Sequence, residues 1–94
     1  MSKASDKPYR LLVARPAANA LSRSLPEKVA LAVVEFITGQ LLDNPQRVGK
    51  PLREPLAPAW SARRGSYRVI YLIDERTRTV TVTMVAHRGD AYRT

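Results

Sequence analysis

The stretch "ARRGSYRVIYLID", residues 62–74, decides the fold. Its uninterrupted apolar run, Val69 to Ile73, is typical of a strand that lies in the middle of a sheet and is covered on both faces. A tight turn at Gly65 precedes the run, so residues 59–64 are predicted to form an antiparallel neighbouring strand. Arg68 lies inside the central strand, and a guanidinium at such a position needs either an acidic partner or a function.

Two further stretches are predicted to be strands. "YRLLVA", residues 9–14, begins the ordered chain. In "TVTVTMVA", residues 79–86, threonines alternate with Val80, Val82 and Met84, which predicts a strand whose Val80, Val82 and Met84 face is buried. Because the turns between the last three strands are short, these strands should form an antiparallel meander, with the last strand near one edge of the sheet.

Two helices are predicted between the first strand and the meander. Pro16 suits a first helical turn and opens a helix over 16–24. Ser24 and Glu27 have the spacing of a capping box, so a second helix should start there and end at Gly39 or near Leu42. A short link between two helices predicts an antiparallel hairpin. The second helix presents an apolar stripe at helical spacing: Val29, Val33, Phe36, Ile37 and Leu41.

Residues 45–58 contain four prolines and are predicted to be an extended loop with no helix, holding one short edge strand near residues 50–53. The fold is therefore predicted to be α+β: an N-terminal strand, an antiparallel helical hairpin and a three-stranded antiparallel meander in one mainly antiparallel sheet. We expect a single domain over residues 1–94, with residues 1–7 as a flexible tail.

Composition excludes several classes of function. The chain has no cysteine, so disulfides, zinc–cysteine sites and thiol catalysis are excluded. One histidine, His87, cannot build a metal site alone, and we expect neither a metal nor a cofactor. No apolar run approaches the roughly 20 residues that cross a membrane, and the polar N-terminus lacks the apolar core of a secretory signal. We therefore expect a soluble, cytoplasmic protein.

The chain carries a net charge of +8, and its basic residues gather in one segment. Such a cluster attracts phosphate, which the planar fork of arginine binds with two hydrogen bonds. An acidic protein partner, or a solvated basic surface, would fit the charge as well. Residues 47–68 hold one acid, Glu54, and six basic residues: Arg47, Lys50, Arg53, Arg63, Arg64 and Arg68.

Strand order predicts where the candidate catalytic residues meet. In an antiparallel meander, the start of the middle strand lies beside the ends of both neighbours, so Arg63, Arg68, His87 and Arg88 should gather at one end of the sheet, with Tyr92 just beyond. Arginines, an imidazole and a phenol suit RNA cleavage by attack of the 2′-hydroxyl on phosphorus. Each residue also has a structural alternative: Arg68 could pair with an acid, His87 could be a surface histidine, and the Tyr92 ring could pack on the sheet.

The segment "WSARRGSYRVIYLID", followed by "VAHRGDAYR", resembles the RelE branch of the RelE/ParE toxin superfamily. The upstream "LPEKVALAVVEFITGQLLDNPQRVGKPL" resembles the helical hairpin and loop of the same family. The resemblance implies a RelE-like fold and a messenger-RNA endonuclease that acts in the ribosomal A site, by 2′-hydroxyl attack and without a metal. It also implies a RelB-like antitoxin with an acidic or amphipathic helix, and contact with promoter DNA through the toxin–antitoxin complex alone.

The resemblance also implies residue roles. Arg68 matches the arginine that stabilises the phosphate in the transition state, and Arg88 matches a second charge stabiliser or proton donor. Tyr92 matches a tyrosine that stacks on the cleaved nucleotide, and His87 is a candidate general base. The predicted contacts with RNA or ribosome are Lys50, Arg53, Arg63 and Arg64.

The sequence departs from the family pattern at two points. The spacing from Arg88 to Tyr92 is shorter than in some relatives, which leaves the role of the tyrosine open. Ribosome-dependent members carry lysines on the strand before the signature arginine, whereas residues 59–64 contain none. Arg63 or Lys50 would supply the positive charge of the missing lysines, and the identity of the general base stays open.

Two other functions stay open as well. The ParE branch shares the fold and inhibits DNA gyrase without cutting RNA, and a degenerate member would bind only its partner.

Overall fold

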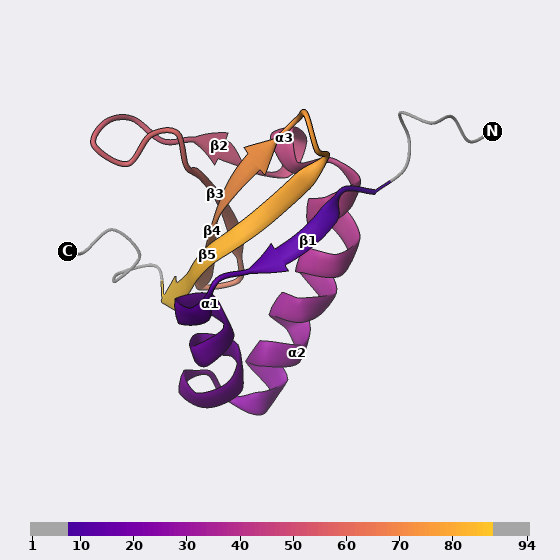
Figure 1. Ribbon diagram of the computed structural model, residues 1–94. Helices are drawn as coiled ribbons and strands as arrows, with labels where there is room; N and C mark the ends of the chain where they lie inside the picture. Colours follow the sequence, from indigo (N-terminus) through magenta and orange to yellow (C-terminus); the bar gives the residue numbers. More distant parts are fainter. Residues whose placement is uncertain (1–7, 88–94) are drawn as a thin grey trace.

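The computed structural model describes residues 8–87, which form a five-stranded sheet in the order β1-β5-β4-β3-β2. Helices pack on one face of this sheet (Figure 1). The α+β prediction is confirmed. The strands are β1 (Arg10–Val13), β2 (Lys50–Pro51), β3 (Trp60–Arg64), β4 (Tyr67–Asp74) and β5 (Thr79–His87), and the helices are α1 (Arg15–Asn19), α2 (Glu27–Phe36) and α3 (Pro45–Val48).

The central position of β4 is confirmed, with β3 and β5 as antiparallel neighbours. The predicted place of β5 near an edge is wrong, because β1 pairs with β5 and forms the edge itself. This pairing is parallel and runs from Arg10 opposite Thr79 to Val13 opposite Val82. Parallel neighbours are joined by long crossovers and not by turns, so no local sequence signal reports which strand β1 will join.

The helical hairpin is confirmed, with two local corrections. A π-helical turn, Ala20–Ser24, continues α1, and a second one, Ile37–Leu41, carries the second helix past Gly39. The predicted capping box is wrong, because α2 starts after Pro26 with no side-chain hydrogen bond at its N-cap. The loop was predicted to hold no helix, yet α3 lies at its start. Pro45 ends the preceding helix and also suits the first turn of the next.

A β-bulge in β5 changes which side chains are buried. Val80 and Val82 are fully buried, as the alternation predicts. The register with β4 then shifts between Ile70 and Tyr71, so that Met84 is 38% exposed and Val85 is buried. The prediction that Met84 is buried is wrong. The bulge inserts one residue and thereby reverses the facing of every later side chain in the strand.

Among residues 8–87 no helix is both long enough and apolar enough to span a membrane.

The core lies between the helices and the covered face of the sheet. The buried side chains come from both helices and from all three long strands: Tyr9, Ala17, Val33, Phe36, Ile37, Leu41, Leu42, Ala62, Val69, Tyr71, Val80, Val82 and Val85.

Candidate phosphate-binding site

A cavity of about 370 Å³ opens where the segment from α3 to β2 meets β3 and β4. We call this cavity the basic pocket. Among residues 8–87, seven line it, of which four are cationic and none is acidic. Cavities of this size hold small ligands, and arginine and lysine are the side chains that bind phosphate. The lining residues are Arg47, Val48, Gly49, Lys50, Ser61, Arg63 and Arg68.

Strand register explains why three of the predicted residues meet in the basic pocket. Arg63 lies directly opposite Arg68 across the β3–β4 pair, and Lys50 lies opposite Ser61 across the β2–β3 pair. Paired residues share a face of the sheet, so all four side chains project from the face that the helices leave open. Like charges placed opposite each other repel, and a bound anion would relieve that repulsion.

His87 lies at the same end of the sheet as Arg68, as strand order predicts, but on the opposite face. Its cross-strand partner is Tyr67, whereas Arg68 pairs with Ala86. The His87 ring meets the Tyr67 ring edge to face, with centroids 5.4 Å apart and planes at 84°. The prediction that His87 gathers with Arg63 and Arg68 is therefore wrong, because the His87 side chain lies on the other face of the sheet. The bulge in β5 reverses the alternation of faces before the strand reaches His87.

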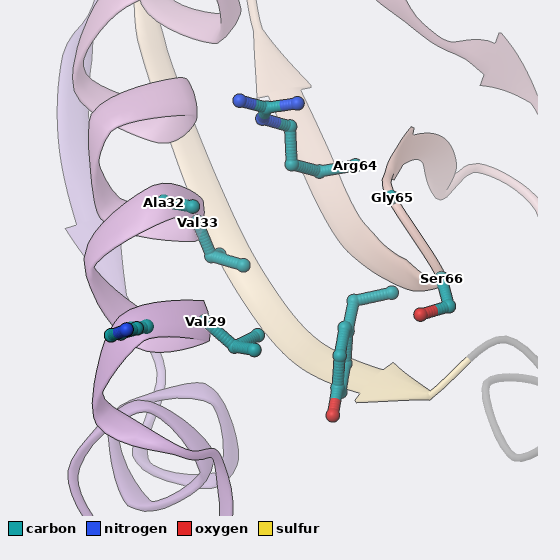
Figure 2. Close-up of a pocket in the computed structure, with 8 residues that line it drawn as sticks. Val29, Ala32, Val33, Arg64, Gly65 and Ser66 are labelled. Atoms are coloured by element: carbon teal, nitrogen blue, oxygen red, sulfur yellow. The ribbon is translucent and has the colours of Figure 1, made fainter.

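Arg64 faces away from the basic pocket. It lines a separate hollow of about 270 Å³ between α2 and the β3–β4 turn (Figure 2). Val29, Ala32 and Val33 supply the helix side of this hollow, and Gly65 lies on the strand side. The lining of this hollow is mainly apolar and also includes two cations, Lys28 and Arg64.

The remaining predicted residues are Arg53, Arg88 and Tyr92. Arg53 is exposed in the loop after β2 and does not line the basic pocket. Arg88 and Tyr92 lie outside the described residues. Sequence reasoning missed Arg47 and Ser61 as lining residues. Arg47 belongs to the basic segment of residues 47–68. Its position on α3 was not predicted, because residues 45–58 were predicted to be a loop without a helix.

The basic pocket has the electrostatics of a site for polyanions. Within the part of the chain that the structure describes, no group of three or more His, Cys, Asp or Glu side chains is placed to hold a metal ion. The basic pocket contains the half-buried side chain of Arg68, and the other cations that line it are Arg47, Lys50 and Arg63. Such preplaced cations are suited to stabilising negative charge on a phosphate.

A match to a family model places this chain among the toxins of type II toxin–antitoxin systems. The family model described as "ParE toxin of type II toxin-antitoxin system, parDE" matches residues 8–92. The chain is therefore a member of the RelE/ParE toxin family, and two similar relatives are named as the toxins RelE and RelG.

Two relatives and one solved structure, all from Mycobacterium tuberculosis, illustrate the similarity. The toxin RelE is 50% identical over 88 residues, covering 94% of this chain and 90% of the relative. The toxin RelG is 54% identical over 69 residues, covering 73% of this chain and 79% of the relative. The crystal structure of the toxin–antitoxin complex RelBE2 superposes with a TM-score of 0.83 at 46% identity, covering 87% of this chain and all of that chain.

Proposed function

We propose that this toxin is a ribosome-dependent messenger-RNA endonuclease that works in the cytoplasm without a metal ion. The observation that carries the proposal is the basic pocket, whose charged lining residues within the described part of the chain are all cations. The similarity to relatives named RelE supports it. The substrate would be the scissile phosphodiester of an mRNA presented by the ribosome.

The proposed reaction places the new negative charge where the cations lie. The 2′-oxygen of the RNA forms a bond to phosphorus and the bond from phosphorus to the 5′-oxygen breaks, leaving a 2′,3′-cyclic phosphate and a 5′-hydroxyl. The oxygens on phosphorus gain negative charge in the transition state. Arg68 is half-buried, so its guanidinium is partly preoriented, and Arg63 lies opposite it. Fixed cations that meet developing charge accelerate such a step.

Two protons move in this reaction. The 2′-hydroxyl loses one, and we assign its acceptor to Lys50. Among the described charged residues that line the pocket, only this lysine has a nitrogen that can exist without its extra proton, because arginine stays protonated in proteins. The 5′-oxygen gains the other proton. From the family resemblance we assign that donation to Arg88 and stacking on the cleaved nucleotide to Tyr92.

We also propose that a RelB-like antitoxin neutralises this toxin. The similar chain from Mycobacterium tuberculosis was solved in a toxin–antitoxin complex. A net charge of +8 favours an acidic or amphipathic partner that would cover the basic pocket and block RNA. Contact with promoter DNA would come through the antitoxin.

A translation assay tests the proposed activity directly. Ribosomes programmed with a defined mRNA are incubated with purified toxin, and the RNA is mapped by primer extension. We expect cuts within the codon in the A site, and none in the same mRNA without ribosomes. A parallel supercoiling assay tests the ParE alternative. Inhibition of gyrase together with intact mRNA would refute the nuclease and support the alternative.

A further inference from the structure

Tyr71 lies directly behind the wall of the basic pocket. Its side chain is fully buried, and its hydroxyl donates a 2.6 Å hydrogen bond to the carbonyl oxygen of Pro45. Pro45 is the first residue of α3, so this bond joins the central strand β4 to the helix that carries Arg47. Burial raises the pKa of Tyr71 to about 12, so the hydroxyl keeps its proton at neutral pH.

Gly49 packs against the same hydroxyl. A Cβ atom on Gly49 would lie 2.1 Å from the hydroxyl oxygen of Tyr71 and 2.8 Å from the carbonyl oxygen of Ser61. The backbone of Gly49 is extended, with φ at −132°, so the need for glycine comes from space and not from backbone conformation. Tyr71 therefore touches the backbone of a residue that lines the pocket.

The segment that supplies Arg47 and Lys50 has little structure of its own. α3 spans four residues and β2 spans two, and elements this short are not stable alone. Besides the β2–β3 pairing and the burial of Pro45, hydrogen bonds of the Gln46 and Tyr71 side chains hold the segment. Gln46 donates to Tyr9 and Glu75 at the partly exposed surface, whereas the Tyr71 bond is buried. A buried bond competes less with water, so we expect it to fix the segment more firmly.

We propose that Tyr71 is a positioning residue of the basic pocket: its hydroxyl holds α3 and the Gly49 backbone so that Arg47 and Lys50 face Arg68. The inference rests on the proposed function, in which these cations bind RNA phosphate. Tyr71→Phe is a clean perturbation. The Trp60 ring stacks on the Tyr71 ring with centroids 6.4 Å apart, and phenylalanine keeps that ring while removing the oxygen.

Amide hydrogen exchange tests the positioning itself. The amides of Arg47 and Val48 both donate to the carbonyl oxygen of Asn44, the N-cap residue of α3. In Tyr71→Phe we expect them to exchange at least about tenfold faster relative to the amide of Ala14, which donates to β5 across the sheet. Val33→Ala is the matched control, because it weakens the core on α2 opposite the β3–β4 turn and should leave this ratio unchanged. A ratio in Tyr71→Phe equal to that of the wild-type protein would overturn the proposal.

RNA binding tests the consequence for the pocket. A short single-stranded RNA with 2′-O-methyl groups, which cannot be cut, is titrated by fluorescence anisotropy at several salt concentrations. For Tyr71→Phe we expect about tenfold weaker binding and a salt slope smaller by about 0.7 for each lost phosphate contact. In a protein already carrying Arg47→Ala and Lys50→Ala, Tyr71→Phe should have no further effect.

The two measurements separate the inference from the proposed function. If wild-type toxin binds the RNA and Tyr71→Phe binds it with the same affinity and slope, the positioning role is refuted. If wild-type toxin does not bind RNA, the phosphate-binding function is what fails, and the exchange ratio still decides whether Tyr71 holds α3.

Discussion

Raising the pH should remove the stabilising effect of the buried Tyr71 hydroxyl in a calculable way. Its pKa is about 12 in the folded protein, against 10.0 for a free tyrosine. Between these values the unfolded chain releases the proton while the folded chain keeps it, so the free energy of unfolding falls as pH rises. Each pKa unit corresponds to about 1.4 kcal/mol. The loss is therefore about 1.4 kcal/mol at pH 11, and it approaches about 3 kcal/mol at pH 12 and above.

Tyr71→Phe isolates this effect from other groups that titrate in the same range. Urea unfolding of both proteins is measured at pH 8 and pH 11. At pH 8 we expect the wild type to be more stable by about 1–3 kcal/mol, because the variant leaves the Pro45 carbonyl without its donor. At pH 11 that advantage should shrink by about 1.4 kcal/mol. An advantage that is the same at both pH values would refute the buried-donor account.

Three substitutions test other parts of the structure. Arg68→Ala should lower the cleavage rate by about 10²–10³-fold, whereas Arg76→Ala, an exposed arginine in the turn at the other end of β4, should leave single-turnover cleavage unchanged. His87→Gln should not change the pH–rate profile, because His87 faces away from the basic pocket; loss of one limb of the profile would contradict this and identify His87 as the base. Leu41→Ala should lower the free energy of unfolding by about 2–5 kcal/mol in a denaturant titration, because Leu41 is fully buried; a loss below about 1 kcal/mol would contradict its place in the core.

The sequence predicted most of the fold because its main signals are local. The apolar run in β4 and the short turns on either side of it predict the meander, and the helical stripe predicts α2. The pairing of β1 with β5 could not be predicted, because no local feature records which distant strand a four-residue strand will join. α3 was missed because prolines argue against helix interiors but are compatible with a first helical turn.

The candidate site was predicted only in part, and a single bulge explains the largest error. The alternation of threonine and valine in β5 continues through Met84 without interruption, so nothing in the sequence marks the extra residue. Strand order alone predicted that His87 lies beside Arg68. The two residues do lie at the same end of the sheet, but their side chains project from opposite faces. The meeting of Arg63 with Arg68 was predicted because it depends on β3 and β4, where the register is regular. Lys50 was predicted as a contact for RNA, but its place opposite Ser61 was not.

The chemistry of the RNA ends tests the central claim most directly. Ribosome-bound mRNA is incubated with wild-type toxin, with Arg68→Ala and with Arg76→Ala, and the ends at each cut are identified. The account predicts 2′,3′-cyclic phosphate or 3′-phosphate upstream and 5′-hydroxyl downstream, made by the wild type and Arg76→Ala and strongly reduced in Arg68→Ala. Uncut mRNA, or ends with 3′-hydroxyl and 5′-phosphate, would contradict it.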